Sequence, residues 1–499
     1  MGSYCLRVTN YQLPISSVLS KTAIRNFTIG ILIALILELC SARGIFAQNT
    51  VAIKFSGTAA GVSTRYIGAV EGNINFDLKD LQDLGINTYR IYGGMSRWEP
   101  EDDDGKYGQP EISEIKANPN IINWTPWDKI MTDPPHGSDY WWSGEPGTVW
   151  QGNARTIFNT LKQANIRPVV SIRNVDNSWN PSWALQLNPP RTKEDWNEWW
   201  EHVFATVYWL NVRNDYRVDD WEIHNEPDYR QQGWGGTMAD YFELVKVAKD
   251  AIDFVYKTYL PDRPYRIHGP ITIGGSKWPA FALQEIPNYF DAVNFHNYDA
   301  DISNYTQKVR SQMKGTALAN SQLWIGEWGS YEVSYNNLSL ALSLIKNLIR
   351  GSQPGDNYIY GSHIFCLYDW GKSGLAEGLL GSGGKRRAGY YALRMGIRAL
   401  QGAKATFFPV ELANSSDLMV VATLDASNNL YLLAVNDQPK SYTVSADISA
   451  LIKAGNGTVR EFGSRAMDEV IGRLTLKGGK VTFAVAGNSA ILIEFNSSN

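Results

Sequence analysis

The stretch WEIHNEP at residues 221–227 places a glutamate, Glu226, where a short apolar run stops at a proline. About a hundred residues later, LWIGEWG at residues 323–329 repeats this arrangement around Glu327, with glycine as the interrupting residue. Because proline and glycine interrupt regular strands, each pattern predicts a strand that ends close to its glutamate. In a barrel of alternating strands and helices, side chains at the C-terminal ends of the strands form the active face.

The sequence around these stretches alternates short apolar runs with longer amphipathic patterns from about residue 60, which is typical of βα units. Eight runs are predicted as strands: residues 66–70, 87–92, 167–172, 220–225, 271–274, 292–296, 322–327 and 364–370. Helical patterns separate most of them, and a last one at residues 390–400 closes the set. This order predicts an α/β fold of the (β/α)8 TIM-barrel class over residues 60–402.

The pattern changes after Gly402 into short alternating segments separated by Asn, Asp, Gly and Ser. Such segments are typical of an antiparallel β-sandwich, which we predict as a C-terminal domain over residues 403–499. An early strand within residues 48–59 precedes the barrel, and we expect it to join the same sandwich. No dense aromatic face marks the sandwich, which favours structural support over glycan binding.

The first 47 residues have the pattern of a secretory signal peptide. Lys21 and Arg25 precede an apolar run at residues 27–37 that is too short to span a bilayer comfortably, and a small-residue site follows at Ala47. The alternative is that the segment stays as an anchor. After cleavage only Cys366 would remain, so no disulfide could form within the chain. We therefore expect a secreted or periplasmic protein with no membrane contact beyond this segment.

Composition narrows the range of partners. A net charge of −4 without a long basic run argues against nucleic acid. Aromatic residues make up 12% of the chain, which fits either a large core or a surface that stacks on sugars. The long insertion at residues 93–150 favours a sugar-binding surface, because it should lie beside the active face and is rich in tryptophan. Its tryptophans are Trp98, Trp124, Trp127, Trp141, Trp142 and Trp150.

The tripeptide Asn225-Glu226-Pro227 at the fourth predicted strand, together with Glu327 at the seventh, resembles the clan A glycoside hydrolases. The resemblance covers about residues 60 to 400, and the added sandwich is similar to family 39, with families 30, 51 and 5 as further relatives. It implies that Glu226 is the general acid/base, Glu327 the nucleophile and Asn225 a ligand of the sugar 2-hydroxyl. Retention would place the two carboxyl groups about 5–5.5 Å apart. The alternative is two strand-end glutamates that only form salt bridges.

The same resemblance implies supporting roles for four residues. Arg90, on the second predicted strand, could keep the nucleophile ionised. His296 and Tyr298 match a His-x-Tyr motif after the sixth strand, where the tyrosine could donate to the nucleophile and the histidine could contact the acid or the substrate. Trp370, at the end of the eighth strand, would form the floor beneath the cleaved sugar. Each of the four could instead be a core or rim residue.

Other residues are weaker candidates for sugar binding. Asn174 follows the third predicted strand and could bind hydroxyl groups. Four tryptophans are expected in loops after strands, where they could stack on sugar rings: Trp179, Trp234, Trp278 and Trp328. His224 faces away from its neighbour Asn225 by strand alternation, which favours a buried structural role.

No metal or cofactor is expected. None of the six histidines is paired at the spacing of metal ligands, and the acidic run at residues 102–104 is more typical of a solvated turn than of a calcium site.

Together these features predict a secreted retaining β-glycoside hydrolase that cleaves a polysaccharide or oligosaccharide by double displacement. The loop tryptophans favour several sugar subsites and hence endo action. The alternatives are an exo-acting β-glycosidase or a transglycosylase and, from another class, a non-catalytic carbohydrate-binding protein. The expected partner is a carbohydrate substrate, and the sequence leaves the oligomeric state open.

Overall fold

The computed structural model describes residues 49–70, 78–93, 106–125, 127–128, 154–173, 188–229, 234–330, 333–369, 378–401 and 405–496. The predicted signal segment at residues 1–47 lies outside them. Among the described helices, none combines the length and apolarity needed to cross a membrane.

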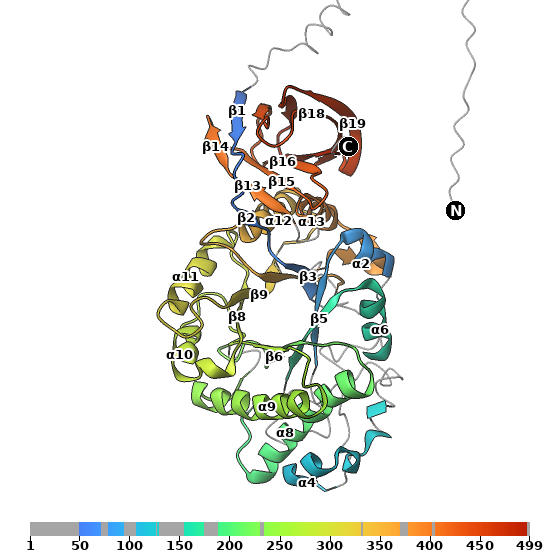
Figure 1. Ribbon diagram of the computed structural model, residues 1–499, viewed down its shortest axis with the longest axis vertical. Coiled ribbons are helices and arrows are strands. Elements are labelled where there is room, and N and C mark those ends of the chain that lie inside the picture. Colours follow the sequence, from blue (N-terminus) through green and yellow to red (C-terminus); the bar gives the residue numbers. More distant parts are fainter. Residues whose placement is uncertain are drawn as a thin grey trace, which may run out of the picture. The chain divides into compact units, whose positions relative to one another are not determined.

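A closed barrel of parallel strands forms the centre of the structure (Figure 1). In barrel order the strands are β10 (Gly361–Phe365), β3 (Tyr66–Val70), β4 (Thr88–Tyr92), β5 (Arg167–Ile172), β6 (Asp220–Ile223), β7 (Arg266–His268), β8 (Ala292–Asn297) and β9 (Gln322–Gly329). Every residue of β4, β6 and β8 is buried, because interior side chains pack on one side of these strands and helices on the other. The predicted TIM barrel is confirmed.

Helices surround the barrel on its outer face (Figure 1). They are α2 (Leu78–Leu84), α4 (Ile112–Ala117), α6 (Ala154–Ala164), α8 (Lys193–Tyr208), α9 (Met238–Tyr259), α10 (Trp278–Glu285), α11 (Ser303–Met313), α12 (Leu338–Ser352) and α13 (Ala388–Ala399). The shorter elements are η1 (Pro119–Ile121), η2 (Trp209–Arg213), η3 (Pro287–Tyr289), η4 (Ser382–Gly384), β11 (Leu380–Gly381) and β12 (Lys385–Arg386). A capping box starts both α8 and α9: Thr192 pairs with Asp195, and Thr237 pairs with Asp240.

Two barrel strands differ from the prediction. The fifth strand is β7 rather than residues 271–274, which follow it. This strand lacks the apolar pattern used for the prediction. Its residues Arg266 and His268 are polar and contact the buried Asp220 of β6 at 2.7 and 3.0 Å. The eighth strand, β10, begins earlier than the predicted run at 364–370, again at polar residues.

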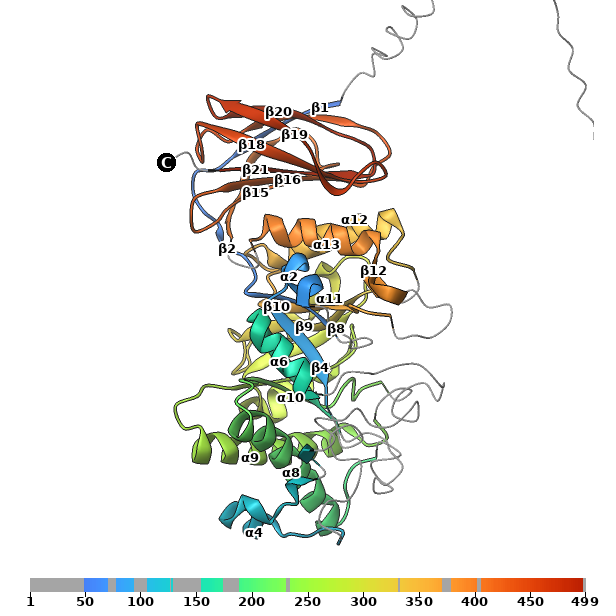
Figure 2. The same ribbon diagram turned by 90° about the vertical axis from the view of Figure 1, so that its right-hand side faces the viewer.

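The other long strands form a second, 11-stranded sheet that folds into two layers (Figure 2). Its order is β14 (Val410–Ala413), β1 (Asn49–Phe55), β17 (Tyr442–Asp447), β20 (Lys480–Val485), β19 (Met467–Lys477), β18 (Ala454–Phe462), β21 (Ser489–Phe495), β16 (Leu430–Asn436), β15 (Met419–Leu424), β13 (Thr406–Phe408) and β2 (Gly61–Val62). β1 pairs with β14 and β2 with β13, both antiparallel. Val51, Leu432, Val444 and Ile493 belong to its separate core. The sheet is the β-sandwich that the sequence predicted beside the barrel.

Helices α12 and α13 lie between the barrel and the sandwich (Figure 2). Arg394 of α13 donates to Asp468 of β19 at 2.6 Å, and Lys346 of α12 contacts Asp437, just after β16, at 2.5 Å. Because Asp468 is only 2% exposed, its ion pair is shielded from solvent. These two helices attach the sandwich to the barrel.

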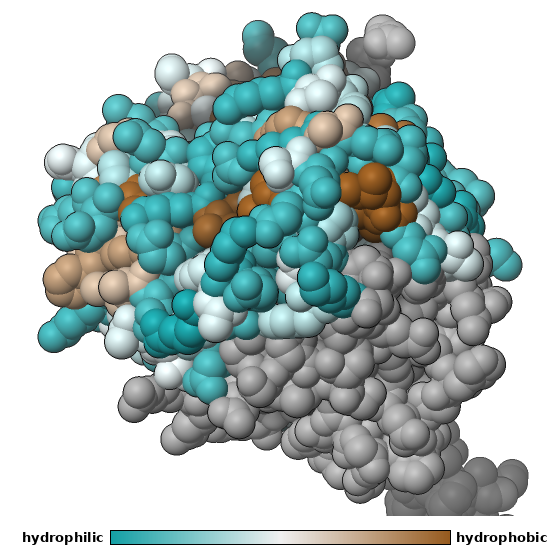
Figure 3. All heavy atoms as spheres, turned by 90° about the horizontal axis from the view of Figure 1, so that it is seen from below, coloured by the Kyte–Doolittle hydropathy of each residue, from teal (hydrophilic) through white to brown (hydrophobic). Residues whose placement is uncertain are grey.

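The side of the molecule formed by α4, α8 and α9 is mostly hydrophilic where it is described (Figure 3). Apolar side chains on this face form separate small groups, as is normal for a solvent-exposed surface. This outer face therefore carries no large apolar patch among its described residues.

Candidate active site

Glu226 lies in a tight turn directly after β6. His224 and Glu226 have φ angles of 67° and 45°, in the left-handed region that non-glycine residues rarely adopt. Ser171 of β5 supports the turn by donating to the carbonyl oxygen of His224 at 3.1 Å. Backbone strain of this kind persists only where the surroundings enforce it, and it is concentrated at functional sites. The turn brings the Glu226 carboxylate to 2.6 Å from Nδ1 of His296 in β8.

Glu327 lies within β9, two residues before the strand ends, and is 4% exposed. Both of its carboxylate oxygens accept hydrogen bonds. Oε1 accepts from Nη1 of Arg90 at 2.7 Å and from the hydroxyl of Tyr92. Oε2 accepts from the hydroxyl of Tyr298 at 2.6 Å. Glu327 is therefore surrounded by donors, which favours its charged form.

The two carboxylates lie close together and share one histidine. One oxygen of Glu226, one oxygen of Glu327 and a ring nitrogen of His296 all lie within 4.8 Å of one another. Nδ1 of His296 is 3.5 Å from Oε2 of Glu327. Carboxyl pairs separated by about 5–5.5 Å act as acid and nucleophile, whereas pairs that must admit a water between them are about 6.5–9.5 Å apart. The spacing found here belongs to the first group.

The charges around the cluster shift the pKa values of Glu327 and His296 in opposite directions. Burial alone would raise the pKa of Glu327, but the charges of His296 and Arg90 and the hydrogen bonds from Tyr298 and Tyr92 lower it to about 2. Burial alone would lower the pKa of His296, but the charges of the two glutamates raise it above the usual value. Both shifts favour the ionised forms of Glu327 and His296.

The low pKa of Glu327 makes stability depend on pH in acid. The ordinary value is 4.5 and the folded value about 2, so between them the unfolded chain binds a proton that the folded protein does not. The stabilisation is present above the ordinary pKa and is lost as the pH falls towards the folded one. We expect the free energy of unfolding to fall by up to about 1.4 kcal/mol per pH unit from this group. Urea unfolding between about pH 5 and about pH 3 measures this slope. Glu327→Gln should show a shallower slope than wild type, and equal slopes would contradict the assignment.

Arg90 connects the cluster to the barrel interior and is fully buried. Besides Glu327, its guanidinium donates from Nε to Glu222 at 2.7 Å and from Nη2 to Oδ1 of Asn225 at 2.9 Å. Asn225 is 7% exposed and lies beside Glu226 in the turn. Arg90 thus holds both Glu327 and Asn225, the residue next to Glu226.

The structure therefore brings together six residues that the sequence singled out: Asn225, Glu226, Glu327, Arg90, His296 and Tyr298. Trp370, Asn174 and Trp179 lie outside the described residues, as does most of the insertion at 93–150.

Three residues of the site were missed: Tyr92, Glu222 and Asn294. Alternation along a strand could have found two of them, because Tyr92 follows Arg90 by two positions and Asn294 precedes His296 by two. The only signal for Glu222 was that it is a charged residue within a strand that was expected to be buried. Asn294 donates to Oε1 of Glu222 at 2.7 Å, so it supports the site from behind.

The tryptophans expected in loops are largely core residues. Trp328 lies within β9 and is 2% exposed, so its placement in a loop was wrong. Trp278 begins α10, and its ring lies 6.0 Å from that of Tyr241. Trp234 is 1% exposed. Large aromatic side chains bury much area, so they fill gaps between helices and strands as readily as they bind ligands. His224 is fully buried, as expected, although it lies in the turn after β6 and not in the strand.

Glu226, His296 and Glu327 could in principle hold a metal ion, since each offers a ligand atom within reach of the others. A cation there would lie beside the guanidinium of Arg90, which is 2.7 Å from Glu327. It would also displace the tyrosine donors on both oxygens of that glutamate. The donor set fits a hydrogen-bonded carboxylate pair better than a metal centre.

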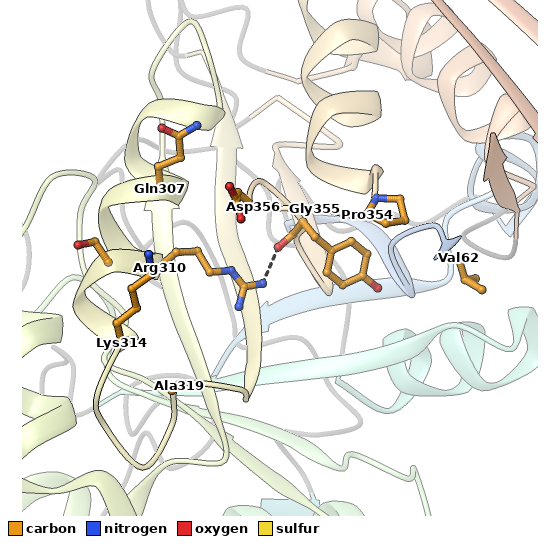
Figure 4. Close-up of a pocket in the computed structure, with 10 residues that line it drawn as sticks. Val62, Gln307, Arg310, Lys314, Ala319, Pro354, Gly355 and Asp356 are labelled. Atoms are coloured by element: carbon orange, nitrogen blue, oxygen red, sulfur yellow. Dashed lines mark hydrogen bonds between the residues drawn. The ribbon is translucent and has the colours of Figure 1, made fainter. Parts of the chain in front are cut away.

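A cavity of about 650 Å³ lies at the opposite end of the barrel (Figure 4). It is lined by α11 and by the segments that lead into the N-terminal ends of β9 and β10. Arg310 projects into it and donates to the carbonyl oxygen of Tyr358 at 2.7 Å, while Lys314 and Asp356 line its rim. This cavity holds one carboxylate rather than a pair, so it lacks the chemistry of the cluster at the other end.

Comparison with curated proteins gives one short similarity. No protein-family model matches the chain. The chain is similar to a beta-xylosidase from Caldicellulosiruptor saccharolyticus, with 28% identity over 121 residues. The match spans 23% of this chain and 23% of that protein, so it covers less than a quarter of the relative's length.

Solved structures are similar over nearly the whole chain. A glucosidase from Croceicoccus marinus has a TM-score of 0.65 at 12% identity, covering 91% of this chain and 100% of that one. A monomeric beta-xylosidase from Caulobacter crescentus has a TM-score of 0.62 at 15% identity, covering 90% and 100%. A GH30 endoxylanase from Clostridium papyrosolvens has a TM-score of 0.58 at 14% identity, covering 90% and 100%. The chain shares their fold, a (β/α)8 barrel with a β-sandwich.

Proposed function

We propose that the protein is a retaining β-glycoside hydrolase, with Glu327 as nucleophile and Glu226 as general acid/base. The observation that carries the proposal is the spacing of the two buried carboxylates, since one oxygen of each lies within 4.8 Å of the other at the C-terminal ends of β6 and β9. Two such carboxylates on the active face of a barrel are what glycosidic cleavage with retention requires. The fold relatives named as a glucosidase, a xylosidase and a xylanase support the same reaction class.

The surroundings of Glu327 suit nucleophilic attack. Hydrogen bonds and the charge of Arg90 hold it as an anion, so it can attack the anomeric carbon as the bond to the leaving oxygen breaks. The product of this first step is a covalent glycosyl-enzyme. When water later cleaves that ester, the same donors stabilise the carboxylate as it regains its charge.

Glu226 supplies the proton that the first step needs. Its Oε1 contacts His296, so the proton transferred to the leaving oxygen is assigned to Oε2. Having lost that proton, Glu226 takes one from the water that attacks the glycosyl-enzyme and returns to its starting state. Asn225 is held beside it by Arg90, where it can bind the 2-hydroxyl of the sugar.

Gly326 offers a test of how tightly the histidine must be held. A Cβ at Gly326 would lie 3.0 Å from Oδ1 of Asn294 and 3.1 Å from Nε2 of His296, so both side chains would have to shift. We expect Gly326→Ala to lower kcat/KM about tenfold or more, because small displacements of reacting groups are costly. Gly472→Ala is the matched control, since nothing lies within 4 Å of a Cβ there. Wild-type activity in the Gly326 variant would show that His296 tolerates displacement.

Xylose-based β-glycosides are the first substrates to test, because several proteins of this fold are named as xylosidases and xylanases. A panel of xylan, xylo-oligosaccharides, xyloglucan and aryl β-xylosides and β-glucosides would be incubated with wild type and with Glu327→Ala. Sugar release by wild type alone supports the proposal. Binding of a glycan without release would favour a carbohydrate-binding protein, and release by both proteins would remove Glu327 from the mechanism.

Product length decides between endo and exo action. Endo action was predicted from the loop tryptophans, but the two tryptophans of the 93–150 insertion that the structure describes are buried: Trp124 is 8% exposed and Trp127 is 0% exposed. Accumulation of mixed oligosaccharides from xylan supports endo action, whereas single sugars released from chain ends contradict it.

We also propose that the protein acts outside the cytoplasm, on the strength of the N-terminal pattern at residues 1–47. Mass spectrometry of protein recovered from the medium or periplasm of an expressing bacterium should find a new N-terminus at Gln48. Intact protein confined to the cytoplasm would contradict this.

A further inference from the structure

Glu222 is a buried carboxylate that the reaction itself does not use. It lies in the middle of β6, two residues after Asp220, and its side chain is fully buried. It therefore lies beneath the active face, while Glu226 comes at the end of the same strand. Its two oxygens nevertheless contact side chains of two other barrel strands, β4 and β8.

The hydrogen bonds of Glu222 require a carboxylate. Oε2 accepts from Nε of Arg90 and Oε1 accepts from Nδ2 of Asn294, both at 2.7 Å. Each oxygen thus faces a donor, and an ionised carboxyl group is the side chain that offers two acceptors and no donor. A glutamine of the same shape would turn its amide NH₂ towards one of these donors. The site is built around the charge of Glu222 and not only around its volume.

Through the rigid guanidinium of Arg90, Glu222 also determines the contacts to Glu327 and Asn225. Its guanidinium is planar, and its N–H groups point in fixed directions. With Nε bonded to Glu222, Nη1 donates to Glu327 and Nη2 donates to Asn225. Fixing one edge of the fork therefore fixes the other two contacts.

We propose that Glu222 is a positioning residue: it orients Arg90 so that one guanidinium holds both the nucleophile Glu327 and the substrate-binding Asn225. Glu222 also neutralises part of the charge of Arg90, so that Glu327 does not face an unbalanced cation. The reaction affected is the glycoside hydrolysis proposed above, and this inference rests on that proposal.

The first test is Glu222→Gln, with a swapped pair as rescue. We expect kcat/KM to fall about 10- to 100-fold, mainly through kcat, because Arg90 loses its orientation while the substrate-binding surface stays. Adding Asn294→Asp should restore most of the activity. In the double variant the amide NH₂ of residue 222 meets an acceptor at residue 294, its amide oxygen still faces Arg90, and the buried charge is regained. Wild-type activity in the single variant would overturn the proposal, and so would a double variant that regains stability but not activity.

Asp220→Asn is the matched control, since Asp220 is another fully buried, ion-paired carboxylate of β6. Its partners are Arg167, Arg266 and His268 instead of Arg90. It should lose stability as Glu222→Gln does but keep its kcat once folded. An equal loss of kcat in both variants would reduce Glu222 to a structural role.

The position of Arg90 can also be determined by a measurement that does not depend on enzyme activity. A crystal structure of Glu222→Gln should show the guanidinium of Arg90 detached from Glu327 or from Asn225, and unchanged contacts would overturn the proposal. If wild type hydrolyses no glycoside, the proposed function fails, while this structure still decides the role of Glu222.

Discussion

Glu327→Ala is expected to lower kcat/KM on the order of 10⁵- to 10⁶-fold, the scale seen when a covalent enzyme loses its nucleophile. The carboxylate is 4% exposed, and its donors remain in place after the substitution: Arg90, Tyr92 and Tyr298. The variant should therefore fold and bind sugar but fail in the first chemical step. Initial rates with an aryl β-glycoside, alongside binding of the same sugar, separate these effects.

The vacated site also makes a positive prediction. Truncation leaves a small space lined by the guanidinium of Arg90 and two tyrosine hydroxyls, which suits a small anion. Added azide should enter it and attack the anomeric carbon from the face opposite the β leaving group, so the product is an α-glycosyl azide. Substantial residual hydrolysis that azide does not change would remove Glu327 from the nucleophile role.

Glu226 and Glu327 could be predicted from the sequence because the patterns that mark them are local. A short apolar run, a glutamate and a chain-breaking residue stand together at 221–227 and again at 323–329. Strand periodicity and turn chemistry act over these same few residues, so the strand ends could be placed. What the local pattern missed was the left-handed turn at His224 and Glu226, since glutamate is not a residue that usually marks such a conformation.

The polar interior of the barrel could not be read in the same way. Glu222 meets Arg90 across 132 positions of sequence and Glu327 meets it across 237, and only the second contact was expected, from the family resemblance. Such contacts exist only once the barrel closes, and apolar periodicity carries no information about them. For the same reason the apolar pattern did not reveal β7, because its residues Arg266 and His268 contact Asp220 where a hydrophobic core was expected.

Tryptophan content pointed to sugar binding, but the location of the tryptophans decides their use. Trp127, Trp199, Trp200, Trp209, Trp221 and Trp324 are all fully buried and stabilise the body of the protein. A large core and a stacking surface draw on the same residue type, so counting alone could not separate them.

Replacing Glu226 should give a loss that depends on the leaving group. We expect Glu226→Gln to lower kcat/KM by about 10² to 10⁴ for unactivated glycosides, which need a proton on the departing oxygen. Glycosides of acidic phenols leave without that proton, so their first step should be nearly unaffected. The glutamine keeps the volume of the side chain at His296, 2.6 Å away in wild type, which separates lost acidity from lost packing. Equal losses for all leaving groups would show that Glu226 is not the acid.

The second step then distinguishes Glu226 from Glu327 by stereochemistry. Without a base at residue 226, water attacks the glycosyl-enzyme slowly, and the intermediate on Glu327 should accumulate with activated substrates. Azide needs no base, so it should attack this intermediate from the face opposite Glu327 and release a β-glycosyl azide. The same anion is thus expected to give an α product with the Glu327 variant and a β product with the Glu226 variant. Because the two carboxylates lie within 4.8 Å on opposite sides of the reacting carbon in the proposed mechanism, only this pairing of products agrees with the assigned roles. The reverse pairing would exchange them.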